Sequence, residues 1–185
     1  MTALLRFDQV TCVRGGRTLF ETLALVLDPG EAVLVTGPNG CGKSSLLRLA
    51  AGLLAPAAGK IDRSAVALAD DNLAFDREQP LRRALACWIS ADAIDRALEG
   101  FGLTDLGEIP VRLLSTGQQR RARLARVVGS EARLWLLDEP THGLDRDGLA
   151  RLDCAIARHR RGGGAVLAAS HALLGGDWRT LDLGA

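Results

Sequence analysis

The chain has 185 residues, of which 48% are hydrophobic and 24% are charged, and its formal net charge is +1. This length suits one compact domain with at most a small subdomain, and the hydrophobic content excludes a disordered chain. The balanced charge excludes a bulk basic surface for nucleic acid. Lys43 and Lys60 are the two lysines among 23 basic residues, so the position of Lys43 is informative.

The cysteines and the apolar runs bear on the cellular compartment. The four cysteines are far apart and form no C-x-x-C pair, so neither a zinc site nor a disulfide framework is indicated, and free thiols suit a reducing cytoplasm. No apolar run reaches the roughly 18–20 residues of a membrane span. The N-terminal residues MTALLRFDQV lack a signal-peptide pattern. We expect a chain that is soluble by itself, so that any membrane role would depend on partners.

Apolar runs of strand length recur along the chain, at 23–27, 32–36, 65–69, 134–137 and 165–169. The last three runs are continuously apolar, which is typical of strands buried on both faces of a parallel sheet. Between the second and third runs, residues 44–54 have apolar side chains at helical spacing, so a helix is predicted there.

The segment GPNGCGKS follows the predicted strand at 32–36 and opens the predicted helix, and it fits the pattern G-x-x-x-x-G-K-[ST]. Its glycines let backbone N–H groups turn toward phosphate oxygens, and the helix start adds positive potential. Lys43 is predicted to reach the β- and γ-phosphates, and the Ser44 hydroxyl to ligate Mg²⁺. The predicted nucleotide contacts are Gly37, Pro38, Asn39, Gly40, Cys41, Gly42, Lys43, Ser44 and Ser45.

Strand signals disappear between about 76 and 129. Ser90 can cap a helix that ends near Gly102, and a second helix is predicted from Ser115 to about Gly129. The start of this second helix is another position that attracts anions. We therefore predict a helical insertion in an α/β sheet.

Two adjacent carboxylates end the apolar run at 134–137. Successive strand residues point to opposite sides, so Asp138 and Glu139 cannot do the same job. Asp138 fits the coordination shell of a metal ion, and Glu139 fits a general base for an attacking water.

In chain order, the segments GPNGCGKS, LSTGQQ, LWLLDEP, HGLD and ASHA resemble the motifs of the ATP-binding cassette (ABC) ATPase family. The resemblance covers essentially the whole chain. It implies an α/β P-loop NTPase fold with a mostly parallel core sheet, a small antiparallel N-terminal β part and a short helical subdomain. We expect a single domain over 1–185, with its core at about 1–75 and 130–185 and the helical subdomain at about 76–129.

The family resemblance also implies a homodimer in which two copies close head to tail around two ATP molecules with Mg²⁺. Each phosphate loop then faces the signature segment of the other copy, so Ser115, Gly117 and Gln118 would contact the partner's ATP. Asp145 would communicate across the dimer. His171 would touch the γ-phosphate and act with Glu139 and Lys43 in catalysis.

The chain departs from the family pattern at two positions. Where the family has a glutamine after the strand at 65–69, we place Asp71, with Gln79 as an alternative that needs a register shift. Asp71 could ligate Mg²⁺, but it adds negative charge beside the γ-phosphate. Where the family stacks an aromatic ring on adenine, this chain has Arg14. Its guanidinium could stack on the base, and a solvated turn arginine is the alternative.

A narrower resemblance rests on the short spacing of 72 residues between Lys43 and Ser115, and on RTLF at 17–20, QQRR with LAR at 118–126, and LWLLDEP at 134–140. These features are similar to the ATP-binding subunits of bacterial cytochrome c biogenesis systems. The similarity implies a peripheral subunit on the cytoplasmic side of the inner membrane, which powers haem export or haem-chaperone release through integral membrane subunits. We expect no direct haem binding and no nucleic acid. The alternatives are an ATPase subunit of another importer or exporter and a weakly hydrolysing regulatory subunit.

Overall fold

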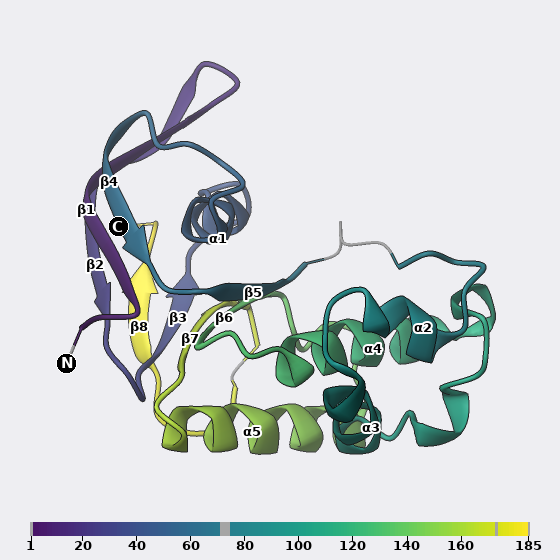
Figure 1. Ribbon diagram of the computed structural model, residues 1–185. Coiled ribbons are helices and arrows are strands. Elements are labelled where there is room, and N and C mark those ends of the chain that lie inside the picture. The colour runs from purple at the N-terminus through teal and green to yellow at the C-terminus, as the bar shows by residue number, and fades with distance from the viewer. Residues whose placement is uncertain (1, 71–74, 173, 185) are drawn as a thin grey trace.

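A computed structural model describes residues 2–70, 75–172 and 174–184 (Figure 1). In the described part of the chain, a five-stranded sheet has the order β5-β6-β7-β3-β8, and its neighbouring strands are parallel. The strands are β3 (Ala32–Thr36), β5 (Val66–Ala69), β6 (Leu134–Asp138), β7 (Ala165–Ala169) and β8 (Arg179–Asp182). The four runs predicted as strands of this sheet are confirmed, and β8 is an addition.

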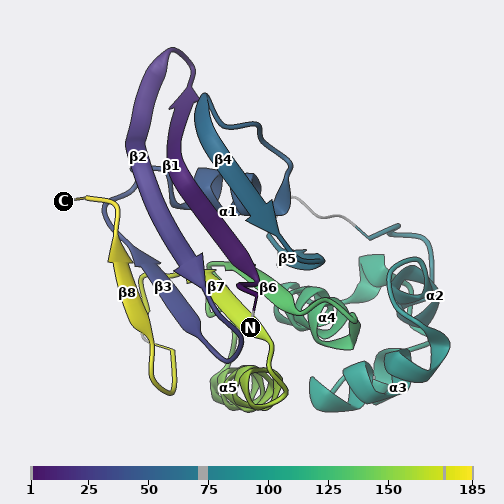
Figure 2. The same ribbon diagram turned by 60° about the vertical axis from the view of Figure 1, so that its left-hand side comes forward.

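A smaller antiparallel sheet has the order β2-β1-β4. It consists of β1 (Leu5–Arg14), β2 (Arg17–Leu27) and β4 (Ala58–Arg63), and the predicted run at 23–27 is the end of β2. Figure 2 shows these strands side by side with helix α1 (Lys43–Ala51) behind them. The fold class predicted from the sequence is confirmed, including the small antiparallel part near the N-terminus.

The two faces of the parallel sheet are covered by different helices. Because side chains alternate along a strand, Leu134 and Leu136 pack on the side of α1, whereas Trp135 and Leu137 pack on the opposite side. There they meet the buried side chains of α5 (Arg146–Arg161). Both faces of each central strand are therefore buried, which explains the continuous apolar runs.

The remaining helices lie together beyond the β5 edge of the parallel sheet (Figure 1). They are α2 (Leu81–Ala86), α3 (Ala91–Gly100) and α4 (Thr116–Gly129), with short 3₁₀ turns at Thr104–Leu106 and Val111–Leu113. Ser90 and Ser115 precede α3 and α4, so both predicted helix starts are confirmed. The division into a core and a helical subdomain at residues 76 and 129 stays a prediction. Among the described residues, no helix combines the length and apolar composition needed to cross a membrane.

Leu136, at the centre of β6, is fully buried. The variant Leu136→Ala should lower the free energy of unfolding by about 2–5 kcal/mol, because it removes packed methyl groups and leaves a cavity. Urea denaturation measures this change. The matched control is Leu53→Ala at a 68% exposed leucine, which should shift stability by less than about 0.5 kcal/mol. Equal shifts for the two variants would contradict the burial of β6.

Candidate nucleotide site

The phosphate loop connects β3 to α1 and has a backbone that requires glycine. Gly37 and Gly42 have φ angles of +133° and +115°, which L residues with a side chain rarely adopt. A Cβ atom on Gly37 would lie 2.9 Å from the Cys41 sulfur, and one on Gly42 would lie 3.3 Å from the Phe20 ring. The loop is therefore closely packed behind its backbone, and its amide groups precede the start of α1.

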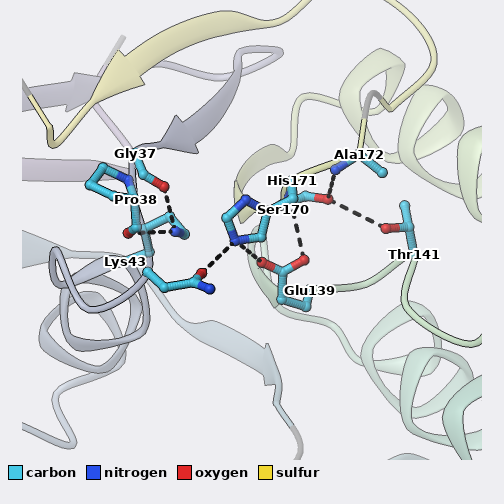
Figure 3. A network of polar contacts seen from close by, with 9 residues as sticks. Gly37, Pro38, Lys43, Glu139, Thr141, Ser170, His171 and Ala172 are labelled. Atoms are coloured by element: carbon cyan, nitrogen blue, oxygen red, sulfur yellow. Dashed lines mark hydrogen bonds and ion pairs between the residues drawn. The ribbon is translucent and has the colours of Figure 1, made fainter.

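Lys43 is 8% exposed and lies over its own loop. Its Nζ donates hydrogen bonds to the carbonyl oxygens of Gly37 and Pro38, at 2.7 and 3.1 Å (Figure 3). Within the described residues, no carboxylate forms an ion pair with this ammonium group. The positive charge of Lys43 is therefore held by neutral carbonyls and is available to an anion at the loop.

A carboxylate and a hydroxyl meet where β6 approaches α1. Ser44 and Asp138 line the same cavity. Burial raises the pKa of Asp138 above its ordinary value; interaction with the nearby Ser44 hydroxyl partly opposes this, and the negative charges of Glu139 and Asp70 add to it. The crowding of carboxylates makes a cation favourable here, and carboxylate and hydroxyl oxygens are ligands that Mg²⁺ accepts.

Glu139 has a φ of +47°, in the left-handed region that a residue with a side chain seldom adopts. Its N–H donates to the Ala169 carbonyl at 2.8 Å, which ties this turn to the end of β7. The Glu139 carboxylate faces His171: its Oε2 accepts from the His171 N–H at 3.4 Å, and its Oε1 lies 3.6 Å from His171 Nε2. His171 Nε2 is also 3.0 Å from Oδ1 of Asn39 in the phosphate loop.

The turn that carries His171 is braced by Ser170, which is 3% exposed. The Ser170 hydroxyl accepts a hydrogen bond from the Ala172 N–H at 3.0 Å and lies 3.3 Å from the Thr141 hydroxyl (Figure 3). These contacts link the segment after β7 to the segment after β6. Sequence reasoning missed Ser170 and Thr141 as supports for His171.

Most of the predicted phosphate-binding residues and all the predicted catalytic residues line one cavity of about 320 Å³, whereas Gly37, Pro38 and Cys41 do not line it. Its lining consists of Asn39, Gly40, Gly42, Lys43, Ser44, Ser45, Asp138, Glu139 and His171. Residues from three distant parts of the sequence therefore meet at one place, as their motifs predict.

The signature residues form a second group that does not line this cavity. Ser115 caps α4 by accepting from the Gln118 N–H at 3.2 Å, and the Gln118 side chain accepts from the Ser115 N–H at 2.8 Å. Gly117 approaches the Gly143 carbonyl, since a Cβ on Gly117 would lie 3.5 Å from that oxygen. Asp145 caps α5 through a hydrogen bond from the Gly148 N–H, so its carboxylate already has a structural role.

The predictions outside the motifs have different outcomes. Arg14 is exposed at the turn between β1 and β2 and does not line the cavity. Asp71 lies outside the described residues. Gln79 also does not line the cavity. Asp70, at the end of β5, was missed: it is 8% exposed, lies 3.9 Å from Arg48 and acts electrostatically on Asp138.

The comparisons with known proteins agree with this geometry. Residues 20–142 match the sequence family described as ABC transporter, and the chain belongs to that family. It is 55% identical to the cytochrome c biogenesis ATP-binding export protein CcmA of Sphingopyxis alaskensis, over 92% of this chain and 91% of that protein. It is 49% identical to the protein of the same name from Zymomonas mobilis, over 98% and 85%. The narrower resemblance predicted from the sequence is therefore confirmed.

Solved structures show the same fold. An ATP-binding subunit of an ABC transporter superposes with a TM-score of 0.84 at 23% identity, over 92% of this chain and 80% of that chain. An ABC transporter ATP-binding protein from Pyrococcus furiosus superposes with a TM-score of 0.83 at 22% identity, over 97% and 96%. At these identities the likeness concerns the fold alone.

The raised pKa of Asp138 predicts a pH-dependent gain in stability for Asp138→Asn in the absence of nucleotide and metal ions. Between the ordinary aspartate pKa and the raised pKa of Asp138, the folded protein binds more protons at this residue than the unfolded chain does. The free energy of unfolding therefore falls as pH rises through this range. The asparagine variant should therefore melt at a higher temperature at pH 7.5, and this gain should shrink toward pH 4. Exposed Asp177→Asn is the control. A gain of equal size at both pH values would contradict the electrostatic cause.

The half-buried Cys41 predicts sensitivity of the site to alkylation. Because Cys87 and Cys154 are exposed, the experiment is made in the double variant Cys87→Ser with Cys154→Ser. N-ethylmaleimide should abolish nucleotide binding there, since the added group lies beside Gly37, and ATP should protect. The same background carrying Cys41→Ser should keep nucleotide binding after treatment. Loss of binding in that triple variant would assign the effect to Cys12.

Proposed function

We propose that this chain is the ATP-hydrolysing subunit of a membrane ABC transporter complex that serves cytochrome c biogenesis. One observation carries the proposal of hydrolysis: Lys43, Glu139 and His171 line the same cavity as the phosphate loop. The role in cytochrome c biogenesis is supported by the names of relatives that are 49–55% identical to this chain over most of their length.

The phosphate groups of ATP would bind to the loop amides between Gly37 and Ser45. Lys43 would exchange its carbonyl partners for oxygens of the β- and γ-phosphates, which are stronger, charged acceptors. The hydroxyl of Ser44 and the carboxylate of Asp138, which already lie together, would hold Mg²⁺. When bound, this ion neutralises charge on the phosphate oxygens.

Hydrolysis would proceed by attack of a water oxygen on the γ-phosphorus, while the bond from that phosphorus to the bridging oxygen of ADP breaks. Glu139 would accept the proton of the water, and the position of this residue in the lining of the cavity beside the phosphate loop supports that role. His171 borders the same cavity and would donate a hydrogen bond to a γ-phosphate oxygen. Glu139 and His171 lie within 3.6 Å of each other, so these two roles would be performed side by side.

The signature group requires a second copy of the chain. Ser115, Gly117 and Gln118 begin α4 outside the nucleotide cavity, so in a homodimer they would face the ATP held by the partner copy. Asp145 caps α5 in the segment next to Gly117 and would report across the same interface. Arg14 would lie against the adenine ring.

The names of the relatives support a proposal for the partners and the location. The integral membrane subunits of a cytochrome c biogenesis complex would anchor this chain at the cytoplasmic side of the bacterial inner membrane. Hydrolysis would power haem export or the release of haem from its chaperone. Haem itself would be handled by those other subunits, and nucleic acid has no part in this function.

The variant Glu139→Gln tests the mechanism. Loss of the general base should lower the rate of ATP hydrolysis by about 10²–10⁴-fold, whereas affinity for a fluorescent ATP analogue should stay within about twofold. The control is Glu108→Gln, at an exposed glutamate that does not line the nucleotide cavity, and this variant should hydrolyse ATP at the parental rate. Hydrolysis by Glu139→Gln at the parental rate would remove Glu139 from its proposed role.

A further inference from the structure

A second and larger cavity, of about 620 Å³, lies between α5 and the helices α3 and α4. It shares no lining residue with the nucleotide cavity. Trp135, near the start of β6, lines this second cavity, whereas Asp138, at the end of the same strand, lines the nucleotide cavity. This volume is in the range of cavities that bind small organic molecules.

The floor of the second cavity is apolar and aromatic. Phe101 and Trp135 line it and are 1% and 3% exposed. The Trp135 indole stacks on the ring of His159, with centroids 3.7 Å apart and an interplanar angle of 9°. Burial lowers the pKa of His159, so the ring is neutral at physiological pH and extends the apolar floor. The half-buried His159 ring, which covers the Trp135 indole, is the part of this stack that a flat aromatic ligand can contact.

The indole of Trp135 leaves a polar group unsatisfied. Its Nε1–H is buried and has no hydrogen-bond acceptor among the described residues. Buried donors without an acceptor are uncommon and unfavourable, because the group has lost its hydrogen bonds to water. Because this nitrogen is inaccessible, a ligand in the cavity does not reach it, and binding depends on the exposed part of the lining.

The rim of the cavity is basic. The charged residues that line it, apart from His159, are four arginines and one glutamate. Among the described residues, the guanidinium groups of Arg96 and Arg158 have no hydrogen-bond or ion-pair partner, whereas that of Arg151 is paired with Asp147. Two guanidinium groups above an apolar floor suit a ligand that combines an aromatic body with an anionic group.

We propose that this cavity is a binding site for a small aromatic anion, whose ring system lies against the half-buried side chains of His159, Val128 and Ala155 and whose carboxylate or sulfonate pairs with Arg96 and Arg158. The proposal does not depend on ATP hydrolysis or on the membrane partners. The opening of the cavity is bordered by Cys154, an exposed residue of α5 that offers a place to block it.

The test titrates 1-anilinonaphthalene-8-sulfonate, a fluorescent aromatic anion, into the full chain in the presence of saturating Mg²⁺ and ATP. We expect saturable binding of one probe per chain, with displacement by 1-naphthoate and none by 1-naphthylmethylamine, which has the same ring and the opposite charge. Probe binding that is seen with the nucleotide-free chain and disappears at saturating ATP would assign the probe to the nucleotide cavity and overturn the proposal. Saturable binding of an acidic peptide without binding of 1-naphthoate would also overturn it.

Three variants locate the bound probe. Arg158→Met should weaken binding at least tenfold, and Cys154→Trp should abolish it by filling the opening. The matched control is Arg161→Met, at an exposed arginine of the same helix outside the cavity lining, which should bind as the parent does. Retained ATP binding shows that each variant is folded. Parental probe affinity in both Arg158→Met and Cys154→Trp would overturn the proposal.

Discussion

The parallel register of three neighbouring strands is the constraint on which the nucleotide site depends. Ala169 of β7 is aligned with Asp138 of β6 on one side and with Val35 of β3 on the other. The three strands therefore end at one level, and the segments that follow them emerge at the same edge of the sheet. The hydrogen bond from the Glu139 N–H to the Ala169 carbonyl continues this alignment for one residue beyond the ladder. A slip in register would separate the loop, the carboxylates and the histidine together.

Charge at this edge is arranged so that the protein alone does not neutralise it. The ammonium group of Lys43 is held by carbonyl oxygens, while Asp138 lies near two further carboxylates and has a raised pKa. A polyanion and a divalent cation arriving together would satisfy both groups. This explains why the site combines a tight glycine turn with a strained backbone at Glu139: both hold groups in positions that are unfavourable without a ligand.

The sequence predicted the central strands, helices α1, α3 and α4, and the residues of the nucleotide cavity, because buried apolar runs and the phosphate-loop motif carry strong local signals. It missed β8, whose sequence RTLD has a single apolar residue and pairs at the sheet edge. Helix α5 was missed because its apolar stripe is narrow, with Leu152 and Ile156 as its buried hydrophobic residues. Asp70 could have been found by treating the end of every parallel strand as part of the site. The second cavity depends on how distant helices pack, and no short motif encodes that.

Helix α5 begins at the cap formed by Asp145 and carries His159 in its last turn. Its 16 residues span about 24 Å along the axis, and its buried side is fixed against the sheet. The aromatic stack near its far end and the segment beside Gly117 are therefore joined by about four turns of a single helix, which sets the distance between these two places along its axis.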